Sequence, residues 1–186
     1  MGAARERLLE AAATRFYDHG VQATGIDTIT AEAGVAKKSL YNNFANKADL
    51  VGAYIDARHQ EWLDLHASRS AEATTASDRV LAVFDAYIDH THGAYEFGFR
   101  GCGLLNAAAE FPAGAPARAS VRAHKEEVEQ ILTRHLEELA DAGRAGEMAE
   151  HLSFLLEGAV ARAGLEGTPA RLEQARGIAA RMIAAL

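Results

Sequence analysis

The chain has 186 residues, enough for one or two compact domains, and 49% of them are hydrophobic, which argues against a disordered protein. No apolar run reaches the eighteen residues that a membrane-spanning helix needs, and the charged first residues are typical of an amphipathic helix rather than a signal peptide. A single cysteine excludes an internal disulfide and fits a reducing cytoplasm, where we expect the protein to act. The formal charge of −7 disfavours a nucleic-acid partner at first sight.

Three helices are predicted in the first part of the chain. Apolar residues at helical spacing indicate a helix over residues 4–19, ended by Gly20 as a left-handed cap. Two short helices follow, over residues 26–33 and 37–44, and between them Gly34 is expected to adopt a positive φ.

The rest of the chain also predicts helices only, so the fold class is all-α. Asn46, Ser77 or Asp78, and Thr168 are the expected N-caps, and Gly143 with Gly146 is expected to end a long helix. The apolar spacing predicts helices over residues 47–68, 80–88, 104–111, 117–142, 147–164 and 169–186.

The second short helix has two unlike faces. Leu40 and Phe44 form an apolar side, and the other side carries lysines, a serine, asparagines and Tyr41, with no carboxylate. A helix that packs on its neighbours and enters the major groove of DNA needs such an arrangement. Residues 1–50 hold six basic and six acidic side chains, so the whole excess negative charge lies in residues 51–186.

The first fifty residues also contain a pattern at fixed spacing. Its members are Phe16, Gly20, Thr24, Ile29, Ala33, Gly34, Val35, Leu40, Tyr41, Phe44, Lys47 and Leu50. This pattern resembles the DNA-binding domain of the TetR/AcrR family of transcriptional regulators. The resemblance implies an all-α fold with a three-helix helix-turn-helix DNA-binding domain over residues 1–46 and a helical effector-binding and dimerisation domain over residues 47–186.

The resemblance also implies which residues meet double-stranded operator DNA. Tyr41 and Lys47 match positions that contact phosphates, and Lys38, Ser39 and Asn42 match positions that face base edges or adjacent backbone. Ala36 stands where a hydroxyl cap is common, and Gly25 replaces another such cap. The expected DNA contacts are Thr24, Thr28, Lys37, Lys38, Ser39, Tyr41, Asn42 and Lys47.

A small-molecule effector site is expected in the second half, because the side chains there offer apolar and aromatic surface together with a few polar groups. Phe84 and Phe154 are expected in the core instead. Cys102 has two interpretations, a redox or electrophile sensor and a small buried hydrophobic residue, and the second is favoured. The expected lining residues are Trp62, His66, Tyr87, Phe99, Cys102, Leu105, Asn106 and His124.

The sequence therefore predicts a ligand-responsive regulator, most simply a repressor that binds a palindromic operator as a homodimer and is released by an inducer. The dimer is expected to form through the last two helices, whose small residues allow close approach. We expect no enzyme activity, cofactor, metal site or membrane span; His90 and His92 lack ligand spacing. The alternative is an all-helical small-molecule-binding protein or enzyme that uses Cys102.

Overall fold

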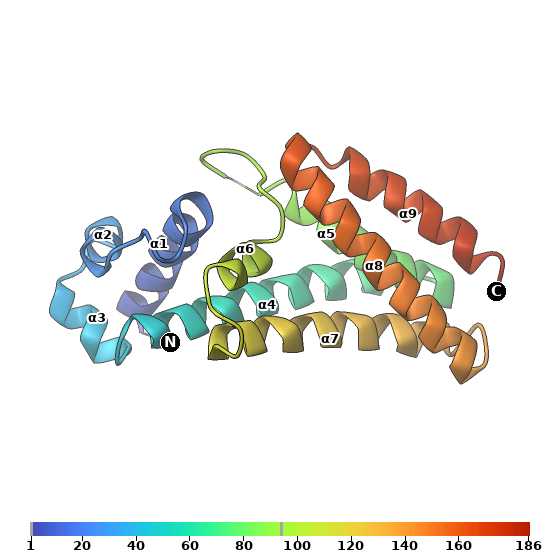
Figure 1. The fold of residues 1–186 in the computed structure, drawn as a ribbon, viewed down its shortest axis with the longest axis horizontal. Coiled ribbons are helices and arrows are strands. Elements are labelled where there is room, and N and C mark those ends of the chain that lie inside the picture. The colour runs from blue at the N-terminus through green and yellow to red at the C-terminus, as the bar shows by residue number, and fades with distance from the viewer. Residues whose placement is uncertain (1, 94) are drawn as a thin grey trace. The chain divides into compact units, whose positions relative to one another are not determined.

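A computed structural model describes residues 2–93 and 95–186 of the chain. Within these ranges there are nine helices and no strand, which confirms the all-α prediction (Figure 1). No helix among these residues is both long enough and apolar enough to cross a membrane. The helices are α1 (Ala3–His19), α2 (Ile26–Glu32), α3 (Lys37–Asn43), α4 (Lys47–Ala71), α5 (Ala76–His90), α6 (Gly103–Ala109), α7 (Pro116–Leu136), α8 (Ala142–Glu166) and α9 (Ala170–Ile183).

The described residues form two compact units. The first unit contains residues 2–59, 95–97 and 103–122, and the second contains the remaining residues. The helices α4 and α7 each contribute residues to both units.

The first unit has a small helical core. Helix α1 packs against α2, α3 and α6, and α2 packs against α3. Phe16 of α1 meets Tyr54 of α4 edge to face, with ring centroids 5.4 Å apart. The predicted core members Ile29, Leu40 and Leu50 are fully buried, which confirms the helix-turn-helix pattern as a packing pattern.

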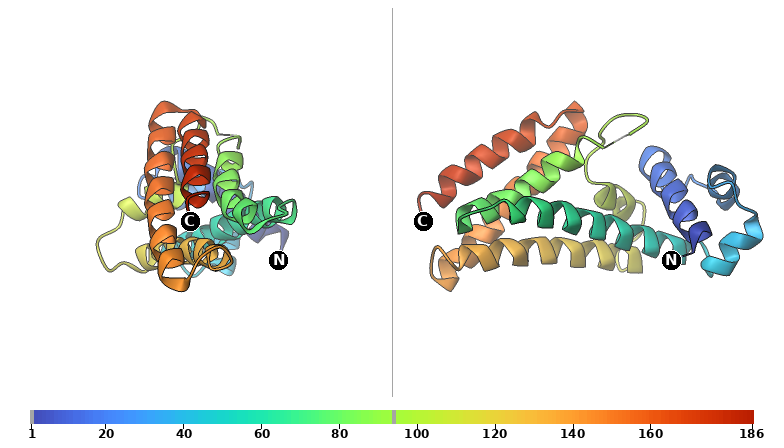
Figure 2. Two further views of the ribbon diagram at one scale, coloured as in Figure 1. Left: turned by 90° about the vertical axis from the view of Figure 1, so that its right-hand side faces the viewer. Right: turned by 180° about the vertical axis from the view of Figure 1, so that it is seen from behind.

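In the second unit α9 lies along α5 and α8 (Figures 1 and 2). Its interior contains fully buried leucines from α7, α8 and α9. Gly164 of α8 is approached closely by a loop rather than by a helix, since a Cβ built on it would lie 2.4 Å from the backbone nitrogen of Gly101. Any side chain at Gly164 would therefore displace this loop.

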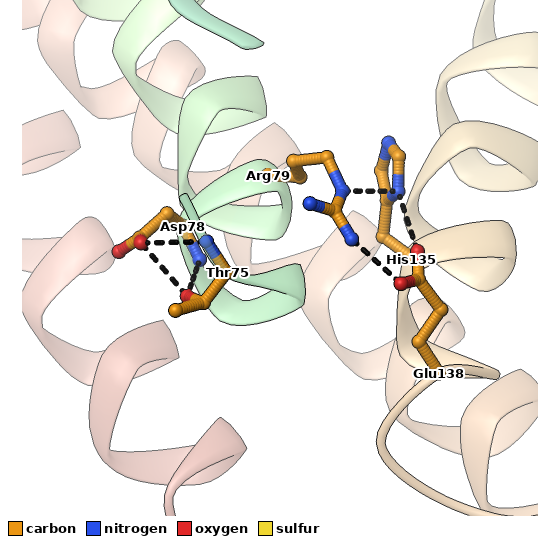
Figure 3. Close-up of polar contacts among 5 residues, drawn as sticks. All are labelled: Thr75, Asp78, Arg79, His135 and Glu138. Atoms are coloured by element: carbon orange, nitrogen blue, oxygen red, sulfur yellow. Dashed lines mark hydrogen bonds and ion pairs between the residues drawn. The ribbon is translucent and has the colours of Figure 1, made fainter. Parts of the chain in front are cut away.

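Figure 3 shows how α5 begins. Thr75, rather than the predicted Ser77 or Asp78, is the N-cap: its hydroxyl accepts from the Asp78 backbone N–H at 3.1 Å, and the Asp78 carboxylate accepts from the Thr75 N–H. The Thr75 hydroxyl also donates to the Asp78 carboxylate at 2.7 Å, and this hydrogen bond, with a second one from the Thr74 hydroxyl, lowers the pKa of Asp78. Arg79 then donates to His135 Nδ1 at 3.3 Å and to Glu138 at 2.6 Å, which ties α5 to the end of α7.

Two predicted helix boundaries in the second unit are wrong. Helix α7 ends at Leu136 instead of near residue 142. Asp141 then starts α8 by accepting from the backbone N–H groups of Gly143 and Arg144, each at 3.1 Å. Gly143 and Gly146 therefore lie at the start of α8 instead of ending the helix before it.

Other caps differ in detail. Asn46 caps α4 as predicted, because its side chain accepts from the Asp49 N–H at 3.0 Å. Thr168 does not cap α9; Pro169 takes that position, without a side-chain hydrogen bond. Gly20 has a positive φ of 89°, but its ψ of 154° lies outside the left-handed helical region, so the predicted cap conformation is wrong. Gly34 adopts the predicted positive φ, 61°.

Candidate nucleic-acid interface and effector site

The first candidate site is the helix-turn-helix formed by α2 and α3. A four-residue connection joins them, and at Gly34 the chain turns with φ of 61°. The Val35 N–H donates to the Thr30 carbonyl at 3.0 Å, so the turn is closed by a backbone hydrogen bond. Leu40 fixes the inner side of α3 because its side chain is fully buried.

The outer side of α3 is polar and free of carboxylates. Lys37, Lys38, Tyr41 and Asn42 are exposed, and Ser39 is half-buried. Tyr41 is 51% exposed, so about half of this large aromatic side chain lies outside the packed core. These residues give α3 donors, acceptors and an aromatic ring on one surface.

An acidic residue of α2 partly offsets this positive charge. Asp27 lies 2.8 Å from Lys37 Nζ, in a pair whose two side chains are both largely exposed. The hydrogen bond to Asp27, together with its charge, raises the pKa of Lys37, so the ammonium stays charged. Lys37 must therefore exchange Asp27 for a phosphate if it is to contact DNA.

Lys47 and Glu110 act on the turn between α1 and α2. The two carboxylate oxygens of Glu110 accept from the backbone N–H groups of Val21 and Gln22, each at 2.7 Å. Lys47 donates to the Gln22 carbonyl at 3.4 Å. Partial burial lowers the pKa of Lys47, and attraction to Glu110 opposes this effect. Glu110 follows α6, so α6 and the turn are joined through its side chain.

The two predicted threonine contacts differ in position. Thr28 is exposed on α2. Thr24 is 3% exposed, and its hydroxyl lies 2.7 Å from the Gly20 carbonyl and 3.2 Å from the Arg15 carbonyl. We therefore interpret Thr24 as a residue that holds the turn, because its hydroxyl donates inward. Sequence spacing could not reveal this direction.

The second candidate site is an aromatic cluster inside the second unit. Trp62 of α4 is 3% exposed and lies at its centre. Its ring stacks on His66 at 5.4 Å, meets Tyr87 of α5 at 5.5 Å and meets His124 of α7 edge to face at 5.6 Å between centroids. Four of the eight residues expected to line the effector site are thus brought together.

Two polar residues that sequence reasoning missed complete this cluster. Lys125 of α7 lies 3.2 Å from the Tyr87 hydroxyl and 2.8 Å from Glu157 of α8. Burial by itself lowers the pKa of Lys125, but its acidic neighbours outweigh burial and raise the pKa, and the Glu157 carboxylate is the one that pairs with it as an anion near pH 7. The pKa of Tyr87 is raised by its burial, against the effect of Lys125. Lys125 is therefore charged beside a neutral phenol.

The other expected lining residues are distributed differently. Phe99 is buried and Cys102 half-buried, and both belong to the second unit. Leu105 and Asn106 are exposed on α6, which belongs to the first unit. Phe154 is 65% exposed, so its predicted place in the core is wrong, whereas Phe84 is fully buried as predicted. In the part of the chain that the structure describes, no three His, Cys, Asp or Glu residues are placed to hold a metal ion.

Comparison with known proteins agrees with both halves of this description. The model of bacterial regulatory proteins of the tetR family matches residues 8–54, and the model of the tetracyclin repressor-like C-terminal domain matches residues 76–179. A crystal structure of a TetR-family transcriptional regulator from Streptomyces coelicolor is 32% identical. The match covers 97% of this chain and 94% of the Streptomyces coelicolor chain, with a TM-score of 0.86.

Two curated relatives match over shorter stretches. The transcriptional activator FasR of Mycolicibacterium smegmatis is 38% identical over 101 residues, which cover 51% of this chain and 45% of FasR. The transcriptional repressor KstR2 of the same species is 34% identical over 95 residues, which cover 47% of this chain and 44% of KstR2. The matches therefore span less than half the length of each curated relative.

Fold and site define an all-helical protein that carries a DNA-binding helix-turn-helix. The chain belongs to the tetR family of bacterial regulatory proteins, and it is a DNA-binding transcriptional regulator.

Proposed function

We propose that this regulator binds a palindromic DNA operator as a homodimer, represses transcription there, and is released by a small molecule bound in its second unit. The observation that carries the proposal is the exposed, carboxylate-free face of α3 above a fully buried Leu40. Such a helix presents side chains to the major groove while its other side is held by the core.

The proposed DNA contacts come from the exposed side chains of α2 and α3 and from the start of α4. Tyr41 and Lys47 meet phosphates, and Lys38, Ser39 and Asn42 reach base edges or nearby backbone. We assign DNA binding to residues 1–46 with Lys47 at their border, and effector binding and dimerisation to residues 47–186. The proposed contact set is Thr28, Lys37, Lys38, Ser39, Tyr41, Asn42 and Lys47.

An exposed apolar row on α8 supports a dimer through the last two helices. Phe154 is 65% exposed and Leu165 is 84% exposed, and the small residues Gly158 and Ala161 lie between them on the same face of the helix. Spacings of four, three and four residues keep all four on one side of α8. A second copy of the chain covers this row, with α9 beside it, and places two recognition helices one DNA turn apart.

Release by a ligand follows from the continuity of α4. This helix contributes to both units, and Trp62 and His66 of the aromatic cluster lie on it. A ligand that displaces these side chains shifts α4, and the separation of the two recognition helices changes. By linkage, operator DNA weakens ligand binding by the same factor.

Repression is the simpler outcome, because a dimer that occupies an operator blocks other proteins there without any further contact surface. KstR2 is named as a repressor and FasR as an activator, so transcription from a bound promoter has to be measured directly. Lower transcript yield in the presence of the protein supports repression, and a higher yield would make it an activator.

The first experiment is a binding titration against DNA upstream of its own coding region, at two salt concentrations. A regulator's affinity falls steeply with salt. Matched variants distinguish a surface contact from a core residue. Tyr41→Ala weakens operator binding and leaves the free energy of unfolding unchanged, whereas Leu40→Ala unfolds the DNA-binding domain. If no DNA binds, including DNA from a random-sequence selection, the proposal fails and the ligand-binding or Cys102-enzyme alternative returns.

A further inference from the structure

The aromatic cluster in the second unit contains buried polar atoms without a hydrogen-bond partner among the described residues. These atoms are Trp62 Nε1, His66 Nε2 and Glu157 Oε2. An indole N–H can only donate and a carboxylate oxygen can only accept. Leaving such atoms unpaired costs stability, and a ligand that pairs them recovers that cost when it binds.

The charges of this cluster are already balanced. Lys125 Nζ lies 2.8 Å from Glu157 Oε1 and 3.2 Å from the Tyr87 hydroxyl, so its ammonium has both a counter-ion and a neutral partner. Burial lowers the pKa of His66, and its imidazole is therefore neutral near pH 7. A charged ligand would lose its hydration here without gaining an unpaired counter-ion.

The surroundings of the unpaired atoms are aromatic. The ring of Trp62 touches three others, from His66, Tyr87 and His124, at centroid distances of 5.4–5.6 Å. Flat aromatic molecules pack well against such rings, stacked or edge to face.

We propose that the effector is an uncharged, flat aromatic molecule that carries a hydroxyl group. Its oxygen accepts from Trp62 Nε1, its hydroxyl hydrogen is donated to His66 Nε2 or Glu157 Oε2, and its ring packs against Trp62. Only the regulatory role of this ligand rests on the proposed function, because its binding chemistry is argued from the cluster itself.

Trp62 is the sole tryptophan of the chain, so its fluorescence reports the site directly. We would titrate the protein with four probes that share one ring: 4-ethylphenol, ethylbenzene, the anion of 4-ethylbenzoic acid and 4-ethylbenzylammonium. With excitation at the red edge of tryptophan absorption, 4-ethylphenol should change the emission saturably. It should bind about 100-fold more tightly than ethylbenzene, about tenfold for each of its two recovered hydrogen bonds. Tighter binding of the carboxylate or ammonium probe would overturn the proposal, as would no binding of any probe.

Variants locate the hydrogen bonds. Trp62→Phe keeps a ring but removes the N–H, so calorimetry should show about tenfold weaker 4-ethylphenol binding and unchanged ethylbenzene binding. Tyr17→Phe, on α1 and outside both the cluster and the proposed DNA contacts, is the matched control and should bind all probes like the parent. If Trp62→Phe discriminates between the two probes as the parent does, the indole N–H plays no part and the proposal is wrong.

A second readout separates the ligand class from the effector role. The same probes are added to the complex of the protein with operator DNA. Binding of 4-ethylphenol without release of DNA keeps the ligand chemistry and removes its role as effector. Release by the carboxylate probe alone keeps a ligand-responsive regulator and overturns the ligand class.

Discussion

Lys125 is a charged side chain in an otherwise apolar row of α7. Val121, Val128 and Leu132 of the same row are buried, and Lys125 itself pairs with Glu157 of α8. A lysine at such a position loses hydration, and its partners have to compensate for that loss. The residue therefore links the stability of the second unit to the chemistry of the aromatic cluster.

Replacing this lysine tests that link. Lys125→Met should lower the free energy of unfolding by about 1–3 kcal/mol, because the Glu157 carboxylate keeps its burial and loses its cation. The double variant Lys125→Met, Glu157→Leu should recover most of the loss, since two apolar groups then pack together. Urea unfolding of the parent, single and double variants measures both values, and equal stability of the single and double variants would contradict this account.

The position of Lys125 within an apolar row was visible in the sequence, but its partner was not. Helical spacing predicted which residues of α7 face inward. The chemistry of aromatic side chains with a few polar groups, rather than their spacing, identified Trp62, His66 and Tyr87, together with His124, as candidates for a common site. Glu157 lies between the buried residues of another helix, and only the packing of α7 and α8 brings it to Lys125. The same limit explains Thr24, because spacing does not tell which way a hydroxyl on a turn points.

Asp27 controls how much positive charge α3 offers to DNA. Asp27→Asn frees Lys37 and removes a negative charge next to the DNA, so DNA affinity should rise roughly two- to fivefold at low salt. The plot of log affinity against log salt should steepen by about one unit if Lys37 gains a phosphate. Fluorescence anisotropy measures both. Glu173→Gln, the same charge change on α9, is the control and should alter neither, and an unchanged slope in Asp27→Asn would show that Lys37 lies outside the footprint.

His66 gives the stability of the second unit a defined dependence on pH. Burial first, and then repulsion by His135 and Arg134, lowers its pKa below the usual value of about 6.5. Below pH 6.5 His66 therefore binds a proton in the unfolded chain but stays neutral in the folded chain until the pH reaches its lowered pKa. The free energy of unfolding falls as the pH falls between these two pKa values. His66→Phe should show a shallower decrease between pH 6.5 and 5 in urea unfolding. A decrease as steep as that of the parent would assign the effect to other histidines.

Among the helices, α6 is a short element whose role depends on Glu110, the residue directly after its last turn. The sequence predicts a short helix over residues 104–111, close to the observed Gly103–Ala109, but nothing in the sequence joins it to the turn between α1 and α2. Glu110 connects α6 to this turn, because its carboxylate accepts two hydrogen bonds of 2.7 Å from backbone N–H groups of the turn. The boundary between α7 and α8 was missed for a related reason: Asp141 starts a helix where two glycines suggested an end, because a side-chain cap outweighs propensity in the first turn.

Removal of the Glu110 side chain should loosen the turn without unfolding α6. Glu110→Ala leaves the Val21 and Gln22 N–H groups without their acceptor, which should cost about 1–3 kcal/mol. Hydrogen exchange at these two amides should accelerate, and Glu110→Gln, which keeps one acceptor oxygen, should lie between the parent and the alanine variant. If the amide of Val21, which is almost fully buried, keeps its protection in Glu110→Ala, the carboxylate does not hold the turn.

Over the full chain, charge and exposed apolar surface are distributed unevenly. The net charge of −7 comes entirely from residues 51–186, while residues 1–50 are neutral overall and concentrate lysines on α3. The acidic part repels a polyanion, so DNA binding depends on the small area around α3. One short recognition helix reads too few bases for specific binding, and in the proposed homodimer a second copy of the chain supplies the other half of the site.

The apolar row of α8 should determine whether that second copy is present. Phe154→Glu combined with Leu165→Glu should convert the protein to a monomer in sedimentation velocity, because charges replace the two largest exposed apolar groups of the row. Affinity for an operator with two half-sites should fall about 100-fold, since the DNA-binding domain of a second copy no longer binds at high effective concentration. Leu139→Glu, outside the row, is the matched control and should remain dimeric. A double variant that remains dimeric with full operator affinity would show that the dimer interface does not lie on α8. A monomer with full affinity would show that one DNA-binding domain is enough for operator binding.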